Sequence, residues 1–118
     1  MSEGRKRLQK RHRSETFDFI VDGQFGRKNL KYTATVGFFP NGHVGDIFLR
    51  AGKAGTDLDI ATRELSIAVS FALQHGATIE EMRAAFPRHG VHPEGALGTL
   101  LDLIVQTGIK DAISEVLE

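Results

Sequence analysis

The side chains best suited to acid–base or metal chemistry in this sequence are its five histidines, which titrate near neutral pH. His89 and His92 stand three residues apart in a segment flanked by prolines, so a folded-back loop would bring them close enough to share a metal ion. A transition-metal site usually needs three or four ligands, and the nearest further candidate in the sequence is Glu94. We therefore predict an exposed histidine pair and no metal site.

A glycine-rich segment ahead of an expected helix could hold a phosphate group. In Gly52-Lys53-Ala54-Gly55, backbone N–H groups and the positive end of the helix would point toward an anion. The segment lacks the Lys-Ser/Thr pair of a P-loop, and Asp57 and Asp59 stand where the anion would approach. A strand-to-helix turn is the favoured interpretation. The candidate anion-binding residues are Gly52, Lys53 and Gly55.

Groups for covalent or general acid–base catalysis are missing or badly spaced. Side chains two apart on a helix diverge, which separates Asp57 from Asp59. Ser66, Ser70 and His75 fall in one helix, but no acid stands at a spacing that would orient the histidine for a hydrolase triad. The sequence contains no cysteine, which excludes a thiolate nucleophile, an iron–sulfur cluster and a disulfide framework. We expect a protein without catalytic activity and without a cofactor.

The net charge of zero conceals a strongly basic N-terminus. Residues 1–13 carry six cations against Glu3 alone, a balance of +5, so the rest of the chain sums to −5. With only Met1 and Leu8 as apolar residues, this segment cannot bury enough surface to offset its ordering entropy, and we expect a disordered tail when it is free. The six cations are Arg5, Lys6, Arg7, Lys10, Arg11 and Arg13.

Such a tail can dock on an acidic protein or on the phosphates of a nucleic acid, where each contact releases a condensed counterion. The tail contains no aromatic residue that could stack on bases. The alternative is a segment that only keeps the protein in solution.

Length and composition indicate one folded domain over residues 14–118. The chain has 118 residues, 41% of them hydrophobic and 25% charged, which is ordinary for globular proteins. The most apolar stretch, Ile60–Leu73, contains Arg63 and Glu64 and is too short to cross a bilayer. The N-terminus lacks the apolar segment of a secretion signal. We expect a soluble cytoplasmic protein that does not bind membranes.

Alternating apolar residues predict three antiparallel strands in the first half of the chain. Thr16–Val21 alternates before the turn at Asp22-Gly23, and Leu30–Phe38 places its apolar side chains on one face. After the turn at Pro40–Gly42, Val44–Arg50 resumes a strand composition. Three strands with one apolar face need helices to cover that face.

Helical periodicity takes over after Thr56, which is a good N-cap for a helix that runs to about His75. We expect this helix to bury one apolar stripe and to be largely buried in its second half. The stripe consists of Leu58, Ala61, Leu65, Ala68 and Ala72, widened by Ile67, Val69, Phe71 and Leu73.

The remaining elements complete an α+β fold. Thr78–Glu81 is a capping-box sequence for a short helix that Pro87 ends, and Arg88–Glu94 is expected to be a loop. Further helices are expected over residues 96–106 and 109–117. The order predicts an N-terminal antiparallel sheet of about three strands packed against C-terminal helices. The first strand as a free edge and the amphipathic last helices leave a homodimer open.

Several strings in the body of the chain stand in a shared order with a known family. They are Tyr32-Thr33-Ala34-Thr35-Val36, Asp46-Ile47-Phe48-Leu49, Gly52-Lys53-Ala54-Gly55, Leu65-Ser66, Ser70-Phe71-Ala72-Leu73-Gln74-His75-Gly76 and Ile79-Glu80-Glu81-Met82. Between Leu30 and Ile104 the sequence thereby resembles the TSCPD domain, a module found at the C-terminal end of adenosylcobalamin-dependent ribonucleotide reductases and as small free-standing bacterial and phage proteins. That family is named for a cysteine-containing motif near its end, where this chain has Gly95-Ala96-Leu97-Gly98.

The resemblance implies a small accessory or binding module that acts beside a reductase or a nucleic-acid machine. In the full-length reductases, catalysis resides in a large barrel domain with radical-generating and redox cysteines, which this chain does not contain. We therefore expect neither reductase activity nor cobalamin binding, and no metal or redox role of the kind that the family's cysteines could play.

Three hypotheses about function follow. The first is a non-catalytic interaction module whose basic tail docks on a larger acidic protein or a nucleic acid. The alternative is a nucleotide-binding or regulatory protein linked to ribonucleotide reduction, with Lys53 and the backbone of Gly52 and Gly55 as the contact. A small enzyme comes third, because no paired acid–base set passes the tests above.

Overall fold

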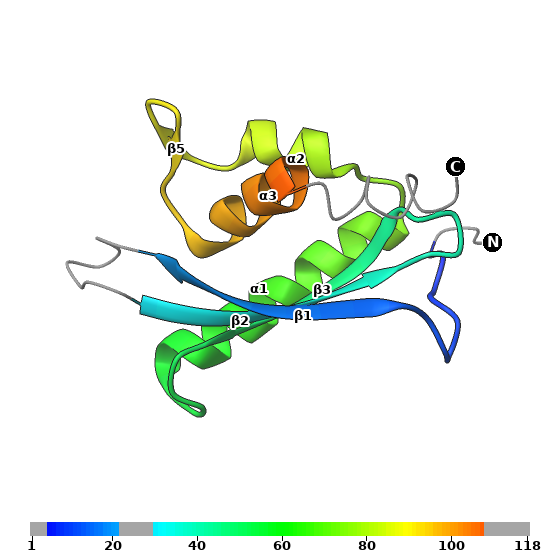
Figure 1. Cartoon of the computed structure of the whole chain (residues 1–118), viewed down its shortest axis with the longest axis horizontal. Helices are drawn as coiled ribbons and strands as arrows, with labels where there is room; N and C mark the ends of the chain where they lie inside the picture. Colours follow the sequence, from blue (N-terminus) through cyan, green and yellow to red (C-terminus); the bar gives the residue numbers. More distant parts are fainter. Residues whose placement is uncertain (1–4, 22–29, 108–118) are drawn as a thin grey trace.

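Among residues 5–21 and 30–107, which the structure describes, the chain forms a three-stranded sheet, three helices and a small hairpin (Figure 1). The structure is a computed structural model. The large sheet contains β1 (Ser14–Val21), β2 (Leu30–Phe38) and β3 (Val44–Ala51), the helices are α1 (Asp57–Gln74), α2 (Ile79–Ala85) and α3 (Ala96–Thr107), and the hairpin pairs β4 (Arg88–His89) with β5 (His92–Pro93).

The predicted α+β class and the three N-terminal strands are confirmed. Both strand pairs are antiparallel in the order β1-β2-β3, which leaves β1 at one edge of the sheet. The register places Phe17 opposite Ala34 and Ala34 opposite Leu49, so the apolar residues of all three strands share one face. The helix expected over residues 109–117 lies outside the described residues.

The main core lies between this apolar face and the last two helices. Figure 1 shows α2 and α3 together on one side of the sheet. The strands contribute Tyr32, Ala34, Val36, Ile47 and Leu49, and α3 contributes Leu97, Leu100, Leu101 and Ile104 on a single helical stripe. None of the described helices is long and apolar enough to span a membrane.

Helix α1 covers the outer edge of β3 rather than the apolar face of the sheet. A strand at an edge exposes a row of unpaired backbone groups, and side chains of α1 satisfy this row. Asp59 Oδ1 accepts a hydrogen bond from Ala51 N–H (3.1 Å), and Ser66 Oγ accepts one from Leu49 N–H (3.0 Å). Ser70 Oγ accepts a hydrogen bond from Ile47 N–H (2.9 Å) and donates one to Ile47 O (2.9 Å). At the end of the helix, Gln74 Nε2 donates a hydrogen bond to Gly45 O (3.0 Å).

The helical repeat explains how one helix can serve a whole strand edge. Four residues advance a helix by about 6 Å. Two residues advance a strand by about 6.8 Å. The polar side chains at 66, 70 and 74 therefore stay in step with the backbone groups at 49, 47 and 45.

The prediction that α1 buries its apolar stripe is wrong for most of that stripe. Ala61, Leu65 and Ala68 are exposed, whereas the buried residues of α1 are mostly polar. They are Asp59, Thr62, Ser66, Val69, Leu73 and Gln74. The physical reason is that a helix beside an open strand edge must supply hydrogen-bonding groups there. Val69 and Leu73 of α1 join the apolar core, and Leu58 packs against it while partly buried.

Removing one of these edge contacts is expected to destabilise the fold measurably. Ser66 is fully buried, and its hydroxyl also donates to Thr62 O, so Ser66→Ala leaves the Leu49 N–H without its acceptor. We expect a loss of about 1–3 kcal/mol in the free energy of unfolding, measured by urea denaturation. Ser14→Ala, which removes the same hydroxyl at an exposed position, serves as the control. Equal stability of the two variants would contradict the edge role of Ser66.

The segment expected to be a loop over residues 88–94 instead contains the β4–β5 hairpin. Gly90 has φ +65°, which fits the first central position of a two-residue hairpin turn. Asp102 of α3 holds the hairpin and α2 together, because it accepts hydrogen bonds from both Arg83 and Arg88. Burial raises the pKa of Asp102, but the hydrogen bonds from Arg88 and Arg83 outweigh it and leave the pKa below its ordinary value.

Candidate functional site

The basic N-terminal segment, residues 5–13, runs along one end of the sheet and touches the body at both of its ends. Lys6 N–H donates a hydrogen bond to Gln74 O (2.6 Å), and Phe38 N–H donates one to Arg13 O (2.9 Å). The first contact reaches the last residue of α1, and the second extends the pairing of β1 with β2. The disorder expected for this segment when it is free stays a prediction.

Two glycines of the sheet make room for the basic segment. A Cβ atom at Gly45 would lie 3.0 Å from Leu8 Cγ and equally close to the ring of Phe39, and one at Gly37 would meet the Asp46 carboxylate first and lie 3.1 Å from the ring of His12. Such contacts are tighter than side chains normally make, so a larger residue at Gly45 would press on Leu8 and Phe39, and one at Gly37 would press on Asp46 and His12. The sheet surface is therefore shaped to accept Leu8 and His12.

The basic segment also lies over aromatic side chains of the body, which sequence reasoning missed. The guanidinium of Arg5 lies 3.9 Å from the ring centroid of Phe71, Lys6 Nζ lies 5.5 Å from that of Phe39, and the guanidinium of Arg13 lies 5.4 Å from that of Phe38. Cations within about 6 Å of an aromatic face are attracted to it. The tail itself lacks aromatic residues, so only the fold could bring rings to it.

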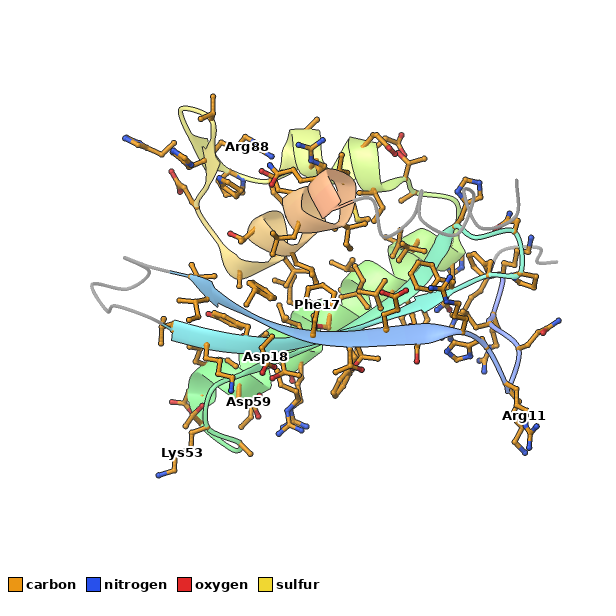
Figure 2. The ribbon with its side chains drawn as sticks, viewed as in Figure 1. Arg11, Phe17, Asp18, Lys53, Asp59 and Arg88 are labelled. Carbon is orange, nitrogen blue, oxygen red and sulfur yellow. The ribbon has the colours of Figure 1, made fainter. Side chains whose placement is uncertain are left out.

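All six predicted binding cations are exposed while the segment is attached. Figure 2 shows Arg11 at one end of the molecule, with its side chain directed away from the sheet. Arg13 forms an ion pair with Glu15, and Arg5 donates a hydrogen bond to Gln74 Oε1. The structure thus gathers the six cations along one end of the protein as a single basic surface.

The fit of Leu8 against Gly45 gives a direct test of this attachment. Gly45→Ala is expected to loosen the segment and to raise the hydrogen-exchange rate of the Lys6 amide about fivefold or more, because exchange follows the population of the open state. Gly95→Ala is the control, since a Cβ at Gly95 would meet nothing within 4 Å. NMR exchange rates that stay the same in both variants would contradict the fit.

The glycine-rich loop lies at the other end of the molecule, where its hydrogen bonds serve the fold. Figure 2 places Lys53 far from Arg11. Gly52 N–H donates to Lys31 O (2.8 Å), and Gly55 N–H donates to Asp59 Oδ2 (3.2 Å). Two of the amides proposed for an anion are therefore already used, and the anion-binding role of Gly52, Lys53 and Gly55 stays a prediction.

Asp59 organises this loop from within the fold. Its carboxylate is fully buried and forms two hydrogen bonds with Arg50, from Nε to Oδ1 (3.1 Å) and from the terminal nitrogen to Oδ2 (3.2 Å). Arg63 Nε lies 3.4 Å from Oδ2. The hydrogen bonds from Arg50, helped by the N–H groups of Gly55 and Ala51, hold the pKa of Asp59 at about 2 against the opposing effect of burial. Asp59 is thus structural, and its carboxylate occupies the Gly55 N–H that an anion at the loop would use.

The histidine pair lies on the hairpin. His89 and His92 are direct cross-strand partners and both are exposed, as expected from the sequence. Within the described part of the chain, no three His, Asp or Glu side chains gather where one metal ion could be held. The absence of a metal site in the protein stays a prediction.

Comparison with known proteins identifies the family. The family profile described as the TSCPD domain matches residues 5–118. The chain belongs to the TSCPD domain family. The match extends beyond the resemblance found by reading the sequence, because it includes the basic segment and β1 as well as residues 30–104.

Curated relatives of this TSCPD domain are much longer proteins. Vitamin B12-dependent ribonucleotide reductases of Streptantibioticus cattleyicolor and Streptomyces clavuligerus are each 33% identical to it over 91 residues, which is 77% of this chain. The matched region is 14% of the first protein and 9% of the second. The chain therefore corresponds to a small part of the reductases it matches. No solved structure matches it.

The residues that join α1 to the edge of β3 belong to the strings that carry the family resemblance. Ser66, Ser70 and Gln74 belong to the strings of the long helix, and Ile47 and Leu49 belong to the string of the strand they serve. The clearest sequence signal for this contact was the recurrence of polar residues every three or four positions, at 59, 62, 66, 70 and 74. In this chain, these strings thus contribute to the architecture of the fold.

Proposed function

We propose that this TSCPD domain is a non-catalytic interaction module whose basic segment docks on an acidic protein or a nucleic acid. The observation that carries the proposal is the attachment of residues 5–13 to the body with all six cations exposed. A segment that is already held in place loses less entropy when it binds than a free tail does. Residues 1–13 carry a net charge of +5 and the rest of the chain carries −5, so the attraction for a polyanion is concentrated at this end of the molecule.

Affinity capture from the native cell extract tests the proposal. The full chain and a variant with the six cations replaced by glutamine would be compared, each with and without nuclease, by mass spectrometry. We expect partners that the variant fails to recover: nuclease-resistant partners indicate an acidic protein, and nuclease-sensitive material indicates a nucleic acid. Recovery of the same partners by both chains would contradict the proposal.

A pocket beside the glycine-rich loop favours a second candidate, a nucleotide-binding or regulatory protein linked to ribonucleotide reduction. This pocket has a volume of about 340 Å³ and is lined by Lys31 and Lys53 among others. Its size lies within the range of small-molecule sites. Millimolar ATP or dATP should then shift the amide NMR signals around Lys53, and unchanged signals would rule the candidate out.

A further inference from the structure

Large hydrophobic side chains gather on the side of the molecule opposite α2 and α3, which we name the open side. Five of the eight exposed large hydrophobic side chains among the described residues lie there. Ile20 and Phe48 alternate with core residues on their strands, and three residues of α1 continue the surface beside them. These three are Ile60, Ile67 and Phe71. Phe48, Ile67 and Phe71 border a single hollow, and exposed apolar side chains grouped in this way are typical of interaction sites.

The centre of the open side is hollowed between β3 and α1. This hollow has a volume of about 210 Å³ and is edged by the rings of Phe48 and Phe71 and the side chain of Ile67. Phe48 is 43% exposed and Phe71 is 42% exposed. The ring of Phe71 is already covered by Arg5, so the ring of Phe48 is the one that provides a surface for another flat ring.

Arg5 connects the hollow to the basic surface. Its guanidinium lies over the ring of Phe71, and its Nε donates a hydrogen bond to Gln74 Oε1. Because a guanidinium has five N–H donors and only Nε is used here, donors remain that can meet a phosphate. The six cations of residues 5–13 begin at the edge of the hollow.

The surrounding charges also favour an anionic partner. Lys31, Arg50 and Arg63 are partly exposed cations of the sheet and of α1 near the open side. The acids there are Asp18, which pairs with Lys31, Asp46, which lines the hollow, and Glu64, which is exposed on α1 between Ile60 and Ile67. The buried Asp59 pairs with both Arg50 and Arg63. Together with residues 5–13, the open side presents more positive than negative charge to a partner.

Aromatic rings interleaved with cations are the surface that single-stranded nucleic acids recognise, because the bases of a single strand can stack on rings while its phosphates meet cations. In a duplex the base faces are hidden, and an acidic peptide has no need of the rings. Building on the proposed function, we infer that the partner of the basic segment is a single-stranded nucleic acid. One base stacks on Phe48 in the hollow, and the neighbouring phosphates contact Arg5 and the cations that follow it.

Asp46 suggests which base to test. A carboxylate accepts a hydrogen bond from the exocyclic amino group of cytosine. A labelled oligocytidine strand of about 20 nucleotides, long enough for several base contacts, is therefore the probe, and a labelled duplex of the same length is the comparison.

Fluorescence anisotropy of the full chain with these two probes tests the inference. Phe48→Ala should weaken single-strand binding about tenfold and change duplex binding less than about twofold. Leu65→Ala is the matched control, because Leu65 is also exposed but lies on the other side of α1. Phe48→Leu keeps the apolar bulk but removes the ring. If this variant loses as much single-strand affinity as Phe48→Ala, the loss is due to stacking on the ring and not to misfolding.

The outcomes separate this inference from the proposed function. The inference is overturned if Phe48→Ala behaves like Leu65→Ala, or if the duplex binds as tightly as the single strand. In either case, binding that still depends on the six cations leaves the proposed docking function standing. If neither nucleic acid binds, the inference fails and the capture experiment decides whether the partner is an acidic protein.

Discussion

Replacing Asp59 with alanine is expected to lower the melting temperature by about 15 °C, because the loss of one member of a buried ion network leaves the others uncompensated. Asp59 is fully buried, and its two oxygens accept hydrogen bonds from Arg50, Ala51 N–H and Gly55 N–H. Arg63 Nε is buried without a hydrogen-bond partner and depends on the nearby carboxylate for charge compensation. The substitution would therefore disturb the end of β3, the loop and the first turn of α1 together.

Asp57→Ala is the matched control for this prediction. Asp57 also lies in the first turn of α1, so both variants lose a favourable interaction with the helix dipole, but Asp57 is exposed. We expect Asp57→Ala to lower the melting temperature by no more than about 4 °C. Scanning calorimetry of the two variants measures the difference, and equal melting temperatures would show that the buried network does not support the fold.

The same carboxylate predicts how stability depends on pH. Its pKa is lowered from 3.8 to about 2 in the folded protein, so the folded state holds the proton less tightly than the unfolded state. The contribution of Asp59 is therefore complete above about pH 4 and is lost as the pH falls toward 2. In acid titrations the stabilities of the wild type and Asp59→Ala should converge over this interval, and a difference between them that stays constant down to pH 2 would contradict the prediction.

Replacing the six cations of residues 5–13 with glutamine is expected to lower the affinity for a single-stranded nucleic acid by about a hundredfold or more at low salt. If all six meet phosphates, the logarithm of the binding constant should fall with the logarithm of the salt concentration with a slope of about −4. The variant should lose most of this slope. Anisotropy titrations at several salt concentrations measure both quantities.

A cation at the opposite end of the molecule provides the control. Lys53→Gln removes one positive charge far from the basic surface, and Figure 2 shows the separation from Arg11. This variant should keep the slope to within about one unit. A slope that falls equally in both variants would mean that the binding follows net charge and has no site at residues 5–13.

The elements of the fold could be predicted because their signals are local. Alternation predicts β2 over the residues that form it, Thr56 accepts the N-cap hydrogen bond of Asp59, and Thr78 forms the expected capping box with Glu81. The β4–β5 hairpin was missed because it is only two residues long on each side and depends on the anchoring of Arg88 by Asp102. Local patterns contain no information about that distant partner.

The environment of α1 could not be predicted from periodicity alone. Leu65 and Ser66 are neighbours, and either side of the helix could have been the buried one. The decision depends on where the helix lies: the free edge of β3 requires hydrogen bonds, so Ser66 and Ser70 turn inward and Leu65 and Ile67 stay exposed.

The sequence by itself determined the α+β class, the order of the strands, the helix caps and the position of the basic residues, since these follow from short-range pattern and composition. Tertiary structure decided what those residues meet. It placed Arg5 over Phe71, Leu8 against Gly45 and the carboxylate of Asp59 beneath Arg50, contacts between residues that are 66, 37 and 9 positions apart in the chain. Such contacts form only when the sheet and α1 have assembled, because the free energy that holds them comes from packing and shared hydrogen bonds.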